Sequence, residues 1–170
     1  MRSLALIILL AFSSAALAAQ TVPVKITSDN MQYTQQADQV VFSGSVHVIR
    51  QDIELWSDTL TVLLEKKQGA SNSTQGALDE QGAIKRIIAQ GNVRIKADKG
   101  RSGTCGKATY EAAKDLLTLE DNPILMEGAN KIQGEVIRLY IKENRSEVIG
   151  GKKRVEAIFS TPADTPGLKQ

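Results

Sequence analysis

Apolar and polar residues alternate over several stretches of the chain, and each stretch is interrupted by glycine, asparagine, aspartate or proline. Residues 40–65, VVFSGSVHVIRQDIELWSDTLTVLLE, alternate, turn at Gly44 and alternate again. Residues 87–97, IIAQGNVRIKA, repeat this pattern around Gly91. A period of two over short runs predicts antiparallel β-strands, and almost no helical period competes with it after residue 18.

The alternating stretches belong to an internal repeat. Sixteen residues after three of the unit starts comes a turn position, at Gly44, Asp121 and Gly150, whereas the second unit reaches Gly91 after 34 residues. Repeated strand-turn-strand units predict an extended surface rather than an active site. The four units begin with SDNMQY (28–33), SDTLTV (57–62), CGKATY (105–110) and GEVIRL (134–139).

The second unit carries 18 extra residues, and their location is evident from composition. Residues 66–82, KKQGASNSTQGALDEQG, are rich in Gly, Ser, Gln and Asn and predict a surface loop. Removing these 17 residues brings the second unit to within one residue of the register of the others.

The N-terminus has the pattern of a secretory signal peptide. Arg2 precedes an apolar run over residues 4–12, and Ala16-Leu17-Ala18 forms a small-residue cleavage site. The apolar run is shorter than the ~20 residues that span a bilayer, so we expect cleavage after Ala18, which removes residues 1–18, rather than a membrane anchor. The predicted domain is then 19–160, followed by a flexible tail at 161–170.

Charge and reactive side chains exclude several classes of function. The 21 basic and 19 acidic residues nearly balance, which leaves no electrostatic footprint for nucleic acid. His47 is the sole histidine and Cys105 the sole cysteine, so a histidine-rich zinc site, a Cys/His dyad and an internal disulfide are not expected. Residues 100–109, GRSGTCGKAT, have the wrong glycine spacing for a phosphate loop. We predict no catalytic centre, no metal and no cofactor.

The inward positions are filled mainly by Val, Ile, Leu and Met, because only seven residues are aromatic. Such positions suit either a tightly packed sandwich or an aliphatic trough. The residues alone slightly favour the packed sandwich.

The repeat as a whole resembles the LptA (OstA) family of periplasmic lipopolysaccharide-transport proteins. The resemblance is carried by SDNMQYTQQADQVVFSGSVHVIRQDIELWSDTL, by IIAQGNVRI and by the segment from KATYEAAKDLLTLEDNPILMEG to KKRVEAIF, over roughly residues 22–159. Each motif is degenerate, but the order, the insertion site and the final RV strand are specific. Asp121 stands where the family commonly has glycine, and aspartate tolerates turn geometry.

The resemblance implies an all-β fold, an OstA-like β-jelly roll shaped like a bent V with an apolar interior that holds the acyl chains of lipid A. It implies a periplasmic protein that receives lipopolysaccharide from an LptC-like inner-membrane component and delivers it to an LptD-like outer-membrane component. It also implies that the apolar inward positions line the groove, namely Val24, Ile26, Met31, Tyr33, Phe42, Val46, Val48, Leu60, Val62, Ile87, Val93, Ile95, Tyr110, Leu117, Leu119, Leu125, Ile137 and Leu139.

The terminal strands of such an open sheet are weakly protected against pairing with another copy. Residues 22–27, VPVKIT, hold one proline, and residues 153–160, KRVEAIFS, hold charges only in their first half. We therefore predict heterologous, head-to-tail assembly through Val22, Val24, Ile26, Val155, Ala157 and Phe159. Two alternatives remain open: a scaffolding β-repeat protein with a filled, dry core, and an LptC-like component that retains a membrane segment.

Overall fold

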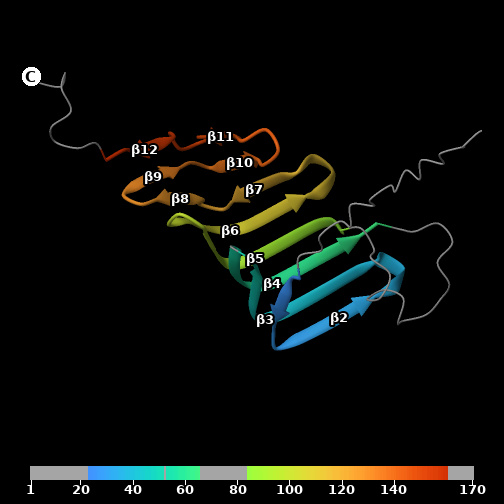
Figure 1. Cartoon of the computed structure of the whole chain (residues 1–170). Coiled ribbons are helices and arrows are strands. Elements are labelled where there is room, and N and C mark those ends of the chain that lie inside the picture. Colours follow the sequence, from blue (N-terminus) through green and yellow to red (C-terminus); the bar gives the residue numbers. More distant parts are fainter. Residues whose placement is uncertain (1–22, 52, 66–83, 161–170) are drawn as a thin grey trace, which may run out of the picture.

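The computed structural model describes residues 23–51, 53–65 and 84–160, which form one antiparallel sheet of twelve strands (Figure 1). The predicted signal peptide, the loop at 66–82 and the tail at 161–170 lie outside the described residues. The strands are β1 (Lys25–Thr27), β2 (Asn30–Thr34), β3 (Gln39–Arg50), β4 (Ile53–Leu64), β5 (Ile84–Ala97), β6 (Arg101–Glu111), β7 (Leu116–Glu120), β8 (Ile124–Glu127), β9 (Asn130–Gln133), β10 (Val136–Tyr140), β11 (Arg145–Ile149) and β12 (Glu156–Ile158), with 3-10 turns η1 (Gln35–Ala37) and η2 (Ala112–Lys114).

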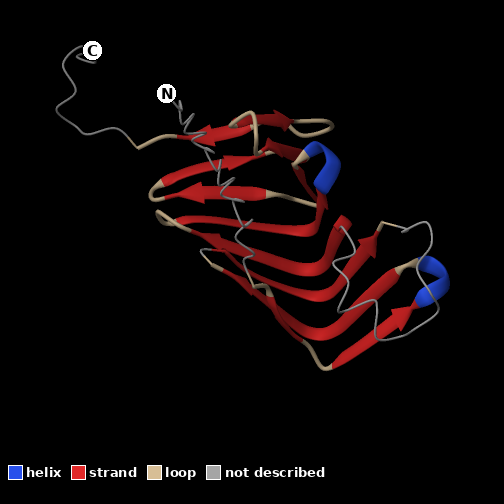
Figure 2. Ribbon diagram, turned by 45° about the vertical axis from the view of Figure 1, so that its right-hand side comes forward, coloured by secondary structure: helices blue, strands red, loops and turns tan. Residues whose placement is uncertain are grey.

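The sheet is folded into a V, because the long strands bend at about their midpoints (Figure 2). Register shifts mark the bends, between Ser43 and Val46, between Trp56 and Thr59, and between Gln90 and Val93. We name the two halves by their short strands: arm A ends in β2 at one edge and β11 at the other, and arm B ends in β1 and β12. The predicted open, V-shaped β-jelly roll is confirmed.

Pairs of residues with left-handed backbone produce the bends. Gly44 and Ser45 have φ angles of 81° and 47°, and Gly91 and Asn92 have φ angles of 79° and 48°. Such residues form a β-bulge, which re-aims the strand. The glycines are required for a second reason, since a Cβ on Gly44 would collide with the side chain of Asp29.

A second repeated device closes the hairpins of arm A. Asp38, Asp115 and Asn144 each lie ten residues after the start of a unit, and each has a left-handed backbone with φ of 46–47°. Each of their N–H groups donates to the carbonyl three residues earlier, at 3.2 Å. The equivalent position of the second unit falls inside segment 66–83 and lies outside the described residues.

The core lies at the bend, between the two arms. Leu119 of β7 and Ile137 of β10 are opposite each other and are both 0% exposed. Val46 and Val93, which follow the bulges of β3 and β5, are also buried. Among the described residues, no helix has the length and apolar character needed to cross a membrane.

Candidate functional site

Three rows of in-register residues cover the inner face of the V, and none of their side chains is charged. The first row, on arm A, is Met31, Phe42, Leu60, Ala89, Ala108, Leu119, Ile137 and Val148. The second, also on arm A, is Tyr33, Val40, Val62, Ile87, Tyr110, Leu117, Leu139 and Ser146. The third, on arm B, is Ile26, Val48, Leu55, Ile95, Gly103, Leu125, Ile132 and Ala157.

The rows of the two arms face each other. A Cβ built on Gly103 of arm B would lie 3.1 Å from Leu125 Cδ2 and 4.0 Å from Leu119 Cδ1. Because Leu119 belongs to arm A, this vector points from one arm towards the other. Residues of one apolar cluster therefore line both arms. The cluster is fully buried at the bend, whereas its members farther out, Val48, Ile95 and Leu139, are only half-buried.

Fifteen of the eighteen predicted groove positions lie in this apolar cluster. Met31 and Val24 are instead 56% and 48% exposed, because Met31 lies on β2 and Val24 directly precedes β1, the two edge strands on the N-terminal side of the described part of the sheet. Tyr110 lies between Ile87 and Leu117 in register, and its hydroxyl donates to Asp115 Oδ1 at 2.7 Å. The structure thus brings the predicted set, apart from Val24, together on one face.

The predicted groove set omits seven members of the cluster, although alternation could have found most of them. The omitted members are Val40, Leu55, Leu64, Ala89, Cys105, Ala108 and Val148. Leu55 lies two positions from Ser57 on the same face, and Val148 lies opposite Ile137. Leu64 ends β4, next to the inserted segment, where no pattern continues. Cys105, the sole cysteine, is packed into the cluster.

The thiol of Cys105 is buried beside Val93, its partner in register. Burial raises the pKa of Cys105 from 9.0 to about 11, because the thiolate would lose its hydration. The thiol therefore stays protonated at neutral pH and behaves as a small apolar group.

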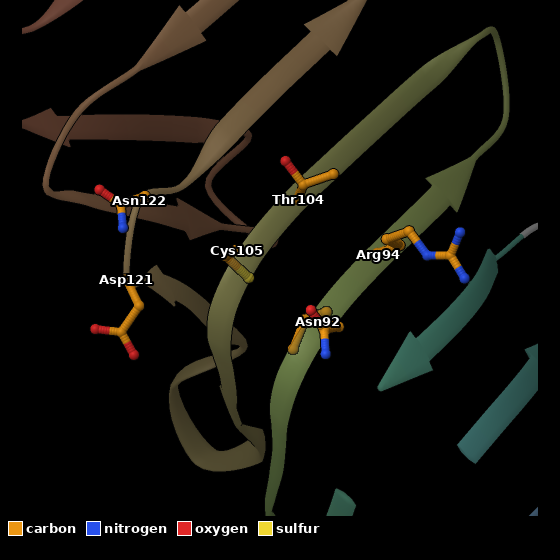
Figure 3. Close-up of a pocket in the computed structure, with 7 residues that line it drawn as sticks. Asn92, Arg94, Thr104, Cys105, Asp121 and Asn122 are labelled. Atoms are coloured by element: carbon orange, nitrogen blue, oxygen red, sulfur yellow. The ribbon is translucent and has the colours of Figure 1, made fainter. Parts of the chain in front are cut away.

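A hollow of about 480 Å³ lies beside the bend, and five of its seven lining residues are polar or charged (Figure 3). The lining residues are Asn92, Val93, Arg94, Thr104, Cys105, Asp121 and Asn122. Arg94 and Thr104, which pair in register, alternate with the buried Val93 and Cys105 and so point away from the inner face. The amide of Asn92 at this hollow donates to Asp58 Oδ2 at 2.9 Å. A site of this composition is unsuited to hydrocarbon, so the apolar inner face is the better candidate site.

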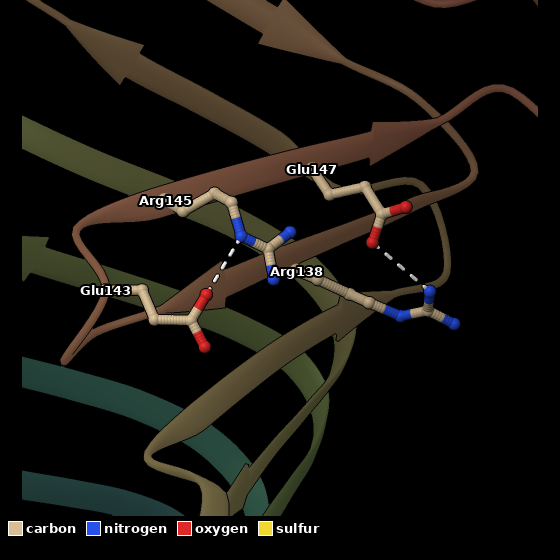
Figure 4. A network of polar contacts seen from close by, with 4 residues as sticks. All are labelled: Arg138, Glu143, Arg145 and Glu147. Carbon is tan, nitrogen blue, oxygen red and sulfur yellow. Dashed lines mark hydrogen bonds and ion pairs between the residues drawn. The ribbon is translucent and has the colours of Figure 1, made fainter.

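Ion pairs cover the outer face of arm A. Lys107 Nζ lies 3.0 Å from Glu120 Oε2 across β6 and β7. Near the C-terminal edge, Arg138 Nη1 contacts Glu147 Oε2 at 3.4 Å, and Arg145 Nε donates to Glu143 Oε2 at 3.0 Å (Figure 4). The outer face of arm A is therefore charged and hydrated, in contrast to the uncharged inner rows.

The outer face of arm B carries the only histidine in an aromatic ladder. His47 stacks on Trp56 with ring centroids 4.9 Å apart, and its Nε2 contacts Glu54 Oε2 at 3.1 Å. The cations of Arg94 and Lys96 lie 5.6 and 5.4 Å from the Trp56 ring. His47 is thus engaged within the sheet, and the described residues include no group of three or more potential metal ligands.

Fold and inner face together define the class: an open, single-sheet β-jelly roll whose two arms enclose an aliphatic surface. Residues 25–145 match the family described as LptA/(LptD N-terminal domain) LPS transport protein. The chain belongs to this family.

Relatives and a solved structure agree with this assignment. The lipopolysaccharide export system protein LptA of Haemophilus influenzae is 24% identical over 138 residues, covering 81% of this chain and 76% of that protein. LptA of Escherichia coli K12 is 26% identical over 140 residues, covering 81% and 70%. The crystal structure of LptH, the LptA homologous periplasmic component of the lipopolysaccharide transport device from Pseudomonas aeruginosa, has the same fold, with a TM-score of 0.66, 12% identity and coverage of 82% and 96%.

Proposed function

We propose that this chain binds the acyl chains of lipopolysaccharide between its arms and carries the lipid across the periplasm, from the inner to the outer membrane. The observation that carries the proposal is the set of three uncharged rows on the inner face. The names of the relatives, which are lipopolysaccharide export proteins, support the choice of lipid.

The energy of hydration explains why such a surface is needed. Each methylene removed from water contributes about 0.8 kcal/mol, so exposing one acyl chain of about a dozen carbons costs on the order of 10 kcal/mol. The half-buried side chains of Val48, Ile95 and Leu139 offer apolar area towards the arm tips. Because Leu119 and Ile137 seal the bend, we place the lipid nearer the tips than the bend.

Head-to-tail stacking would extend the inner rows from one protomer to the next. In arm A the strands run β2-β3-β4-β5-β6-β7-β10-β11, and in arm B they run β1-β3-β4-β5-β6-β8-β9-β12. Each path has eight antiparallel strands, so the last strand of one copy would lie antiparallel to the first strand of the next. Among the predicted interface residues, Val22 lies outside the described residues; Val24, Ile26, Val155, Ala157 and Phe159 lie in or beside β1 and β12.

The cellular context of the proposal follows from the sequence. We place cleavage after Ala18 and a single domain at 19–160, with a surface loop at 66–82 and a flexible tail at 161–170. The protomer would accept lipid from an LptC-like component and pass it to an LptD-like component. It would act without a catalytic centre or cofactor.

Photo-crosslinking tests the proposal on matched inner and outer positions. Benzoylphenylalanine at Phe42, Ile95 or Leu139 should capture added lipopolysaccharide, because these side chains belong to the inner apolar cluster. The same group at Lys96 or Arg138, the outward neighbours of Ile95 and Leu139, should not. Equal capture at both sets would contradict the inner site, and no capture at any position would favour a scaffold with a filled core.

A further inference from the structure

The inner face of arm B ends in charged residues. Continuing the alternation of β3 from Val46 and Val48 brings Arg50 to the inner side, and continuing that of β6 from Gly103 brings Arg101 to the same side. We call this edge of arm B the lip. In order across the strands its residues are Arg50, Ile53, Ala97, Arg101, Glu127 and Asn130.

Arg50 acts across the gap on arm A. Burial and the Asp115 carboxylate raise the pKa of Tyr110, whereas the positive charge of Arg50 lowers it. Since Tyr110 belongs to the second inner row of arm A, this effect agrees with the inward placement that the alternation of β3 gives Arg50. An anionic group at the mouth between the arms would therefore meet a cation.

Arg101 is held at the lip by its own hairpin. Its Nε donates to the carbonyl oxygen of Asp98 at 3.2 Å, which leaves the other guanidinium N–H groups as further donors. Glu127 lies opposite in register, yet within the described residues no ion pair joins the two side chains. Arg101 is thus restrained and exposed.

The spacing of the two arginines suggests the kind of anion they fit. Three strand steps separate β3 from β6, which corresponds to about 14 Å at the usual strand spacing. A single small anion cannot bridge such a gap, whereas a head group with phosphates at both ends of a disaccharide can. Guanidinium groups suit phosphate because they offer paired donors.

We propose that Arg50 and Arg101 bind the phosphate groups of the lipid A head group while its acyl chains lie against the inner rows. This inference rests on the proposed function and adds the polar part of the site. It makes the lip a determinant of specificity, because an uncharged lipid with similar chains would gain only the apolar contacts.

The test compares two lipids and three variants of the mature chain. Arg50→Gln and Arg101→Gln should each weaken binding of diphosphoryl lipid A by about tenfold or more, the usual effect of losing a hydrogen bond between charged groups. With monophosphoryl lipid A, one of the two variants should lose its effect, because its phosphate is absent. Arg94→Gln is the control: it removes the same charge from the outer face of arm B and should change either affinity less than about twofold.

Affinities are measured with a fluorescent lipid A probe in one buffer and detergent, and thermal melts check that each variant folds. If wild-type protein binds neither lipid, the proposed function fails. If wild-type protein binds but both lip variants match it, or if Arg94→Gln weakens binding as much as they do, the proposed function stands and the lip assignment is wrong. An equal loss for both lipids in both variants would likewise show that the arginines do not recognise phosphate.

Discussion

The side chain of Asp121 lies against the backbone of Gly106, so that a Cβ on Gly106 would come 2.5 Å from the Cβ of Asp121. At the other bends the carboxylate comes from the opposite member of the pair. Asp121 thus occupies a turn position that the other units fill with glycine, and Gly106 compensates by occupying the position that they fill with a carboxylate. The other pairs are Asp29 with Gly44, Asp58 with Gly91 and, one residue beyond the turn position of the fourth unit, Glu135 with Gly151.

This reversed pair can be tested by swapping it back. Gly106→Asp alone should destabilise the fold by about 1–3 kcal/mol, because it forces a second side chain into an occupied bend. Adding Asp121→Gly should recover most of that loss, since it recreates the arrangement of the first bend. Urea unfolding of the wild type and the three variants measures the coupling. A double variant as unstable as Gly106→Asp would show that the two residues are not a matched pair.

Much of the fold could be predicted because the repeat depends on local features of the sequence, namely the alternation of apolar residues and the turn-forming residues. Alternation predicted the strands, and the spacing of Gly44, Gly91 and Asp121 located the bends. The prediction that the chain turns between two strands at Gly44 and Gly91 was wrong, because these glycines form bulges inside the continuous strands β3 and β5. The coupling of Gly106 to Asp121 could not be predicted, because the partners are 15 residues apart and meet only through strand pairing.

The sequence could predict which residues face inward, but not how deeply each of them is buried. Period two identifies Phe42, Ile95 and Leu119 alike as inward residues. Whether an inward residue is sealed or partly exposed depends on how far the arms open at that point, which no local pattern encodes. Leu119 is therefore a core residue, whereas Phe42 and Ile95 are half-buried and better placed for lipid.

Truncations should separate these two roles. Leu119→Ala or Ile137→Ala should each cost about 2–5 kcal/mol in unfolding free energy, because both side chains are fully buried. Leu139→Ala should cost less, because its side chain is only half-buried, yet it should weaken lipid binding more at equal folded fraction. Chemical denaturation and lipid titration on the same preparations provide the comparison. Equal losses of stability at all three positions would contradict the conclusion that Leu139 is less deeply buried than Leu119 and Ile137.

The segment between β4 and β5 should be dispensable for folding. Leu64 and Ile84 are partners in register, so the ends of the two strands are already adjacent without the intervening residues. Replacing residues 66–82 by a four-residue turn should leave the melting temperature nearly unchanged. Each doubling of loop length changes the entropic cost of closing the loop by only about 0.6 kcal/mol. A large drop in melting temperature would mean that the segment contributes to the core.

Cys105 should resist alkylation in the folded protein. Its pKa is raised to about 11, so the thiolate fraction at pH 8 should be about a hundredfold lower than for a thiol of pKa 9.0. Iodoacetamide should label Cys105 readily in urea and very slowly in buffer, as followed by mass spectrometry.

The same shift has a consequence for stability. Because the folded-state pKa lies above the unfolded one, the unfolded chain loses its thiol proton first as pH rises from about 9 to 11. The contribution of the neutral thiol is present below this window and is lost across it. Cys105→Ala should therefore lack this part of the alkaline decline, and identical alkaline profiles for variant and wild type would contradict the assigned shift.

Assembly through the sheet edges can be tested with one strand of arm A. Met31 and Gln32 are neighbours on the edge strand β2, but Met31 is in register with Phe42 of the inner row, whereas Gln32 pairs with Val41 on the other face. Met31→Lys should reduce concentration-dependent growth of oligomers, because it places a charge where the inner row would continue into the next protomer. Gln32→Lys, the matched control, should assemble more nearly like the wild type, since its charge faces water.

At the opposite edge, deleting residues 156–170 or placing proline at Ala157 should block growth, because Ala157 lies in the edge strand β12. Circular dichroism and lipid binding should show that the isolated protomer still folds and binds. Light scattering on the mature protein over a wide concentration range decides the matter. A strict monomer at every concentration, or a closed dimer that none of these changes affects, would exclude the stacked bridge. A diffusing carrier would then be the better account, because a heterologous edge contact that does not close into a ring keeps adding copies as the concentration rises.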